Sequence, residues 1–141
     1  MKLLILIRGV PGSGKSTLAE HIAYSHCYPE EHGIFNVKVY EADMFFMEDH
    51  KWGNKYTYDK SKIQMAHYWC QEQTENAMKK GIETIIVSNT FTKIWMMERY
   101  YWLAATHNYN VQEIICKGNF QNIHGCPQSS IDRMKKEFEY V

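Results

Sequence analysis

Blocks of apolar positions alternate along the chain with segments in which apolar residues recur three and four apart. The continuous apolar or β-branched blocks predict buried strands over residues 3–7, 37–40, 84–87 and 111–116. The periodic segments predict helices over residues 15–24, 61–80 and 93–107, and a short one after residue 127.

Three of the predicted helices have a recognisable inward face. For residues 61–80 this face consists of Ile63, Ala66, Cys70, Thr74 and Ala77. For residues 93–107 it consists of Ile94, Met97, Tyr101 and Ala104. In the last helix it consists of Ile131, Met134 and Phe138, and we expect His67, Tyr68 and Trp69 to lie mostly in the core as well.

The alternation of strands and helices predicts an α/β fold, a three-layer sandwich with a mostly parallel sheet. The chain has no internal repeat and no linker, so we expect a single domain over residues 1–141. In such a sheet the ligand site lies beyond the carboxyl ends of the strands.

The first predicted strand runs directly into a phosphate-binding motif. Residues 9–17 read GVPGSGKST, which matches G-x-x-x-x-G-K-S between a strand and a helix. Main-chain N–H groups of such a loop form a nest for phosphate oxygens. The predicted nucleotide contacts are Gly9, Pro11, Gly12, Ser13, Gly14, Lys15, Ser16 and Thr17. We expect Lys15 to reach the β- and γ-phosphates of ATP and the Ser16 hydroxyl to bind Mg²⁺.

Other nucleotide-binding classes do not fit these residues. A dinucleotide fold needs G-x-G-x-x-G, and the third position is occupied by Thr17. The guanine motif N-K-x-D fails at Thr57, and the length leaves no room for the extra modules of helicases or transporter ATPases. The motif therefore predicts a small P-loop kinase.

A kinase needs a base for the attacking hydroxyl, and Asp43 at the end of the second strand is the leading candidate. Its structural alternative is the N-cap of a helix that begins at Met44, and the two roles are compatible. Glu41, Glu48 and Asp49 are predicted to be solvated. Ser88 stands where many P-loop proteins place an acidic partner of Mg²⁺, so either Asp43 helps to hold the water shell of the metal or Mg²⁺ depends mainly on phosphates and Ser16.

Several polar residues are candidates for binding substrate. Asn89 and Thr90 suit the orientation of a hydroxyl or phosphate, although they also suit a turn. Lys55 and Tyr58 belong to a Lys- and aromatic-rich stretch that predicts either a nucleic-acid contact or a solvated loop. Residues 117–130 are predicted to form a short lid, with Lys117 and Arg133 as cation donors to ATP.

The composition of the chain limits the classes of binding partner and indicates a cellular location. Sixteen Lys and Arg balance sixteen Asp and Glu among 141 residues, which argues against coating of long nucleic acids or binding to anionic membranes. The apolar run at the start is interrupted by Arg8 and is too short for a signal peptide or a membrane span. Four Cys without C-x-x-C spacing predict free thiols and a cytoplasmic location.

Five further segments carry a resemblance to a known family. They are Glu41–Phe46, Tyr56–Asp59, Ala66–His67, Ser88–Thr90 with Trp95 and Tyr100, and Asn122–Gly125 before Met134. With residues 9–17, they resemble the small P-loop kinases that include bacteriophage polynucleotide 5′-hydroxyl kinase domains, compact phage ATP-binding proteins and animal NEDD-binding-protein-like kinases. The resemblance implies that Asp43 is the general base, that Lys15 and Ser16 bind phosphate and Mg²⁺, and that residues 117–133 form the lid.

The chain also departs from that family. Its polynucleotide kinases have arginines beside the catalytic Asp, where this chain has Ala42 and Phe46, and the region of their lid arginines holds Phe120 and Gln121. We therefore expect an ATP-dependent phosphotransferase acting on a hydroxyl of a nucleic acid, either a 5′-end or a hydroxylated modified base. A nucleoside or small-metabolite kinase and a nucleotide-binding accessory protein with weak ATPase activity remain the alternatives.

Overall fold

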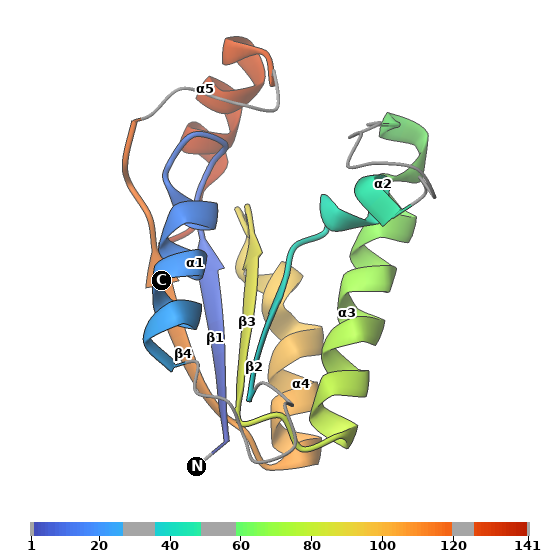
Figure 1. Ribbon diagram of the computed structural model, residues 1–141. Coiled ribbons are helices and arrows are strands. Elements are labelled where there is room, and N and C mark those ends of the chain that lie inside the picture. Colours follow the sequence, from blue (N-terminus) through green and yellow to red (C-terminus); the bar gives the residue numbers. More distant parts are fainter. Residues whose placement is uncertain (1, 27–35, 49–58, 120–125, 141) are drawn as a thin grey trace.

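The computed structural model describes residues 2–26, 36–48, 59–119 and 126–140 (Figure 1). Its strands are β1 (Leu3–Arg8), β2 (Val37–Tyr40), β3 (Thr84–Asn89) and β4 (Asn110–Ile115). Its α-helices are α1 (Lys15–His26), α2 (Met44–Glu48), α3 (Ile63–Lys79), α4 (Glu98–His107) and α5 (Gln128–Glu137). Two 3₁₀ turns, η1 (Lys60–Lys62) and η2 (Ile94–Met97), lead into α3 and α4. Within the described ranges, no helix is both long enough and apolar enough to cross a lipid bilayer.

The four strands form one parallel sheet in the order β2-β3-β1-β4. Leu3 is in register with Thr84 on one side and with Asn110 on the other. The inner strands β1 and β3 are almost entirely buried, as their continuous apolar runs predict, whereas β4 at one edge is only partly covered. All four carboxyl ends therefore meet at one edge of the sheet, and the predicted α/β fold is confirmed.

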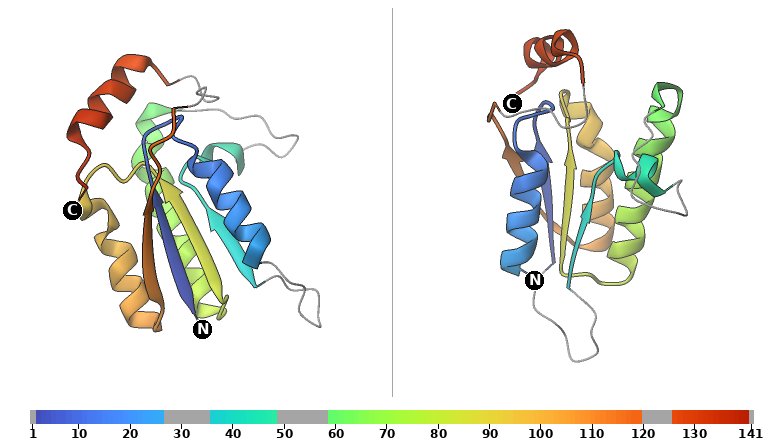
Figure 2. Two further views of the ribbon diagram at one scale, coloured as in Figure 1. Left: turned by 90° about the vertical axis from the view of Figure 1, so that its left-hand side faces the viewer. Right: turned by 45° about the horizontal axis from the view of Figure 1, so that its top comes forward.

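Helices cover both faces of the sheet and complete three layers (Figure 2). Alternate residues of a strand point to opposite faces, so Leu4 and Leu6 belong to one apolar cluster and Ile5 and Ile7 to another. The first cluster packs against α3 and α4, and the second packs against α1 through Ala19. The phosphate loop thus connects the central strand to the helix layer on one face.

The predicted inward face of residues 61–80 is confirmed, because Ala66, Cys70, Thr74 and Ala77 are buried and Ile63 is half-buried. The prediction for His67 and Tyr68 is wrong. Both have exposed side chains, although His67 is close enough to Asp43 to interact with its charge, and Trp69 is half-buried. The helical rotation of about 100° per residue carries His67 and Tyr68 away from the buried face of Ala66, whereas Trp69, three residues after Ala66, returns toward that face and packs against the same core cluster.

The predicted inward face of residues 93–107 is wrong at two positions. Ile94 and Tyr101 are 38% and 40% exposed, whereas the buried side chains are those of Met97, Tyr100, Leu103 and Ala104. The four buried residues define a face centred near Tyr100, and Tyr101 lies about 100° further round the helix, at the margin of that face. Tyr101 instead donates its hydroxyl to Glu113 of β4.

The C-terminal segment is fastened to β1 through Arg8, a charged residue that is only 1% exposed. Nε and Nη2 of Arg8 donate to the carbonyl of Phe91 at 3.1 and 3.0 Å, and Nη2 also donates to the carbonyl of Glu139. The guanidinium lies 4.7 Å from the ring centroid of Phe138. On the other side of α5, Ile131 packs in the same cluster as Val10 of the phosphate loop. The last helix is thus held against the loop at both ends.

Candidate functional site

The phosphate loop follows β1 and has the tightly curled backbone that its glycines predict. Gly12 and Gly14 have φ angles of 83° and 94°, a region that glycine adopts far more readily than residues with a Cβ. The N–H of Ser13 donates to Val10 O at 3.1 Å, and the N–H of Leu18 donates to Gly14 O at 3.0 Å, which begins α1. The loop therefore enters the helix in the arrangement that an anion nest requires.

The interior of this loop fits the phosphates of a nucleotide. A Cβ at Gly9 would lie 2.3 Å from Ser13 Oγ and 2.9 Å from the carbonyl oxygen of Cys116, so only glycine fits there. Ser13 is 3% exposed, and its Oγ has no hydrogen-bond partner within the described part of the chain. A buried hydroxyl without a partner is costly, and a phosphate oxygen would satisfy it.

Lys15 lies at the start of α1 among charged groups of opposite sign. Burial lowers the pKa of Lys15, and the negative charges of Glu41 and then Asp43 act in the opposite direction. Its Nζ donates to Val10 O at 3.3 Å, at the rim of the loop. The structure thus brings the predicted phosphate-binding lysine and the predicted base into one electrostatic neighbourhood.

Glu41 has a more specific position than the sequence analysis expected. Ser16 Oγ donates to Glu41 Oε1 at 2.8 Å, and Glu41 is half-buried, so the prediction that it is merely solvated is wrong. The position of Glu41 and Asp43 directly after β2 indicates that both lie at the edge of the sheet where β1 ends, but it does not indicate which of them contacts Ser16.

Asp43 lies between β2 and α2, on a turn that Asn89 of β3 holds by a hydrogen bond. The carbonyl of Asp43 accepts the N–H of Phe46 at 3.1 Å, so Asp43 lies directly before α2, at the position predicted for an N-cap. Asn89 is 7% exposed, and its Oδ1 accepts the N–H of Ala42 at 2.8 Å. Asn89 therefore holds the residue between Glu41 and Asp43. The carbonyl of Thr90 accepts the N–H of Gly9 at 3.1 Å, which ties the end of β3 to the phosphate loop.

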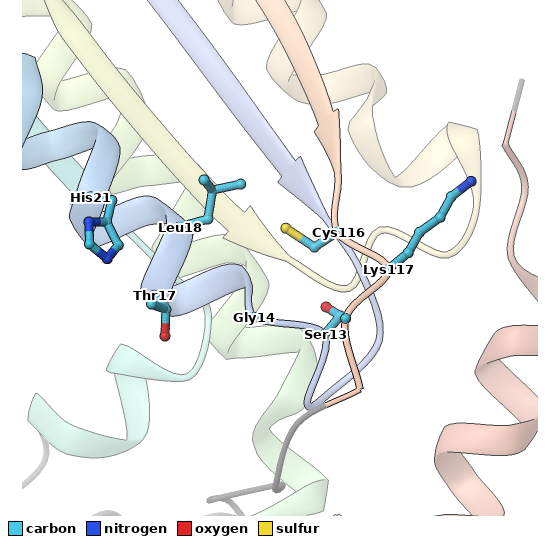
Figure 3. Close-up of a pocket in the computed structure, with 8 residues that line it drawn as sticks. Ser13, Gly14, Thr17, Leu18, His21, Cys116 and Lys117 are labelled. Atoms are coloured by element: carbon cyan, nitrogen blue, oxygen red, sulfur yellow. The ribbon is translucent and has the colours of Figure 1, made fainter.

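A cavity of about 430 Å³ lies beside the phosphate loop (Figure 3). It is lined by Ser13, Gly14, Thr17, Leu18, His21, Cys116, Lys117 and Gly118. This volume falls within the range of small-ligand pockets. Leu18, His21 and Cys116 were not among the predicted nucleotide contacts. The signal for two of them is helical spacing, because Thr17, Leu18 and His21 lie on the same face of α1 as Gly14.

The two predicted cation donors do not point into this cavity. Lys117 extends away from it (Figure 3), and its Nζ lies 5.0 Å from the ring centroid of Tyr140. Arg133 is exposed on α5 and is not among the residues that line the cavity. The predicted substrate residues Lys55 and Tyr58, and residues 120–125 of the predicted lid, lie outside the described residues.

The chain is similar in sequence to known proteins. A family model described as an AAA domain matches residues 4–119. Human NEDD4-binding protein 2 is 31% identical over 146 residues, which cover 97% of this chain but only 8% of that protein.

Solved structures with low sequence identity show the same fold. A chain in the structure of the Pnkp1/Rnl/Hen1 RNA repair complex superimposes with a TM-score of 0.67 at 16% identity, over 99% of this chain and 44% of that one. Kti12 of Chaetomium thermophilum, in complex with ADP-AlF3, superimposes with a TM-score of 0.56 at 12% identity, over 96% of this chain and 80% of that one.

Proposed function

Because the chain belongs to the P-loop kinases of this AAA domain family, we propose that it transfers the γ-phosphate of ATP to a hydroxyl group. The observation that carries the proposal is the gathering of Lys15, Ser16 and Asp43 at the carboxyl ends of β1 and β2. Lys15 is the phosphate-binding cation, and its charge interacts with Glu41 first and then with Asp43. The combination of a phosphate-binding cation and a carboxylate base is what phosphoryl transfer to a hydroxyl requires.

The nucleotide would lie across the loop and the adjacent cavity. Main-chain N–H groups of residues 9–14 and the hydroxyl of Ser13 would bind the phosphates, with Lys15 at the β- and γ-phosphates. The nucleoside part would occupy the cavity between Leu18 and Cys116. Bound Mg²⁺ would neutralise charge on the phosphates, with the Ser16 hydroxyl as its protein ligand.

In the transfer step, Asp43 accepts the proton of the acceptor hydroxyl while the acceptor oxygen forms a bond to the γ-phosphorus. The bond between the γ-phosphorus and the β–γ bridging oxygen breaks, and ADP leaves with that oxygen. Asp43 is held for this task by the turn that Asn89 fixes through Ala42. Its carboxylate therefore needs little rearrangement before the reaction.

We place the acceptor hydroxyl on a nucleic acid, at a 5′-end or on a modified base. The side of the site beyond Asp43 is formed by α2 and the amino-terminal end of α3, which pack together (Figure 1). Lys60 and Lys62 are exposed at that end of α3 and suit contacts with backbone phosphates. The similar structure that comes from an RNA repair complex supports the same class of acceptor.

A small hydroxyl compound is the second candidate, and one observation favours it. Ala42 and Phe46, which flank Asp43, are 8% and 3% exposed and belong to the apolar core. An arginine at either position would have to bury its charge, so these two positions are unsuited to gripping a nucleic-acid phosphate. Phe45 beside them lies 6.3 Å from Trp69, centroid to centroid, and adds apolar surface.

The test is a labelled γ-phosphate transfer screen over DNA ends, RNA ends, DNA with hydroxylated bases, nucleosides and nucleotides. Transfer should require Lys15 and fall to background in Lys15→Ala. For a nucleic-acid acceptor, Lys60→Glu with Lys62→Glu should weaken transfer and flatten its salt dependence, whereas a small acceptor should be phosphorylated as before. Absence of transfer to every acceptor would refute the proposal and favour a nucleotide-binding accessory protein.

A further inference from the structure

The carboxylate that accepts from Ser16 belongs to Glu41, directly after β2, whereas the end of β3 beside the phosphate loop has no acidic residue. Ser88 on β3 is in register with Ile7 of β1, is 2% exposed, and its Oγ has no hydrogen-bond partner among the residues described. Glu41 Oε1 accepts the hydroxyl of Ser16 at 2.8 Å. The acidic residue in contact with the phosphate loop at this edge of the sheet therefore lies in the segment that follows β2.

The direction of the hydrogen bond is informative. A serine hydroxyl has one proton and two lone pairs, so donation to Glu41 leaves the lone pairs of Ser16 Oγ for a cation. A carboxylate that accepts from a metal ligand orients that ligand and increases its basicity. The contact therefore presents Ser16 to Mg²⁺ in the form that binds it best.

The choice of glutamate also agrees with the sheet order. β2 is separated from β1 by β3, which places it about 10 Å from the strand that leads into the phosphate loop. A longer side chain is suited to that span. Asn89 fixes the intervening Ala42, so Glu41 and Asp43 leave the same turn as two separately placed carboxylates.

We infer that Glu41 is the metal-positioning residue of this site: it orients Ser16 and holds the water shell of a divalent cation, the role left open by Ser88. The inference rests on the proposed function, because the metal is the one that accompanies the nucleotide. The two carboxylates of this turn then have different roles: Glu41 positions the metal, and Asp43 accepts the proton of the acceptor hydroxyl. Within the described residues no three His, Cys, Asp or Glu side chains form a metal site of their own, so phosphate oxygens and water must supply the other ligands.

The experiment measures Mn²⁺ binding to the protein–ADP complex by electron paramagnetic resonance, which needs no acceptor and no turnover. Glu41→Gln should weaken Mn²⁺ binding about 10- to 100-fold, the range typical for loss of a group that orients a metal ligand. ADP binding in EDTA should stay at the wild-type value, which shows that the loop is intact. Glu20→Gln, at an exposed position of α1, is the control for removal of one negative charge and should bind Mn²⁺ normally.

The outcomes separate this inference from the proposed function. Wild-type Mn²⁺ affinity in Glu41→Gln, or an equal loss in Glu20→Gln, would overturn the inference alone. A loss in Asp43→Asn without a loss in Glu41→Gln would assign the metal to Asp43 and overturn it as well. Normal Mn²⁺ behaviour in a protein that phosphorylates no acceptor would leave the inference standing and refute the kinase, whereas failure of the wild-type complex to bind Mn²⁺ would refute both.

Discussion

Arg8→Met removes the guanidinium that joins β1 to the C-terminal segment while keeping an unbranched side chain of similar length. In the folded protein this group is 1% exposed and donates to the main-chain carbonyls of Phe91 and Glu139. It also forms an ion pair of 3.4 Å with Glu113, whose side chain is 34% exposed. The variant therefore leaves two carbonyls and part of a carboxylate without their donor.

The expected loss of unfolding free energy follows from these contacts. Removing one partner of a buried charged network costs about 3 to 5 kcal/mol, because the groups left behind stay desolvated and unpaired. The Glu113 contact adds little, since its carboxylate remains partly hydrated. The stacking of the guanidinium on Phe138 at 4.7 Å is also lost. For a chain of this size, a loss of that magnitude lowers the Tm by roughly 10 °C.

Urea unfolding followed by tryptophan fluorescence and circular dichroism measures the difference. The matched control is Arg99→Met, which removes an exposed arginine stacked 4.4 Å from the ring centroid of Trp102. That control should cost less than about 1 kcal/mol. If Arg8→Met and Arg99→Met lose the same unfolding free energy, the reasoning from burial and unpaired carbonyls is wrong.

Three shorter predictions concern the site and its surroundings. Asp43→Asn should lower kcat by about 10²- to 10⁴-fold at unchanged ADP affinity, and transfer at the wild-type rate would contradict its role as base. Gly9→Ala should weaken ATP binding in calorimetry at least about tenfold, because its Cβ would lie 2.3 Å from Ser13 Oγ, whereas Gly81→Ala, with φ +77° and open space, should affect stability alone. Burial raises the pKa of the Cys70 thiol to about 11 from 9.0, so its contribution to stability is present below pH 9 and is lost as the pH rises toward 11. Unfolding curves of Cys70→Ala should show a smaller fall over that interval than the wild type, and an equal fall would exclude Cys70 as its source.

Strands and the phosphate loop were predictable because their signals are local. β2 was predicted over its observed residues, since a short β-branched block bounded by polar residues has few other structures available. The curled backbone at Gly12 and Gly14 follows from the same kind of local requirement, in which glycine is needed for a positive φ.

Features that depend on distant partners were not predictable. In the sequence, Arg8 is the polar residue that ends an apolar run, which predicts exposure. In the structure it is buried, and the carbonyls that accept its hydrogen bonds lie 83 and 131 residues further along the chain, so no local pattern indicates them. The contact between Ser16 and Glu41 depends on the order of the strands, which one sequence does not disclose. The buried face of α4 is centred on Tyr100 and not on Tyr101, and two adjacent tyrosines give no local signal for which of them packs against the sheet.

The central position of β1 has a consequence for synthesis of the chain on the ribosome. Leu3 pairs with Thr84 and Asn110, so β1 has no sheet partner until β3 has been synthesised. At about 5 to 20 residues per second, that interval lasts roughly 4 to 16 seconds. During it, residues 3–7 are an unpaired apolar strand open to aggregation or to a chaperone. Nucleotide binding should therefore be acquired late, after β4 has closed the other side of β1.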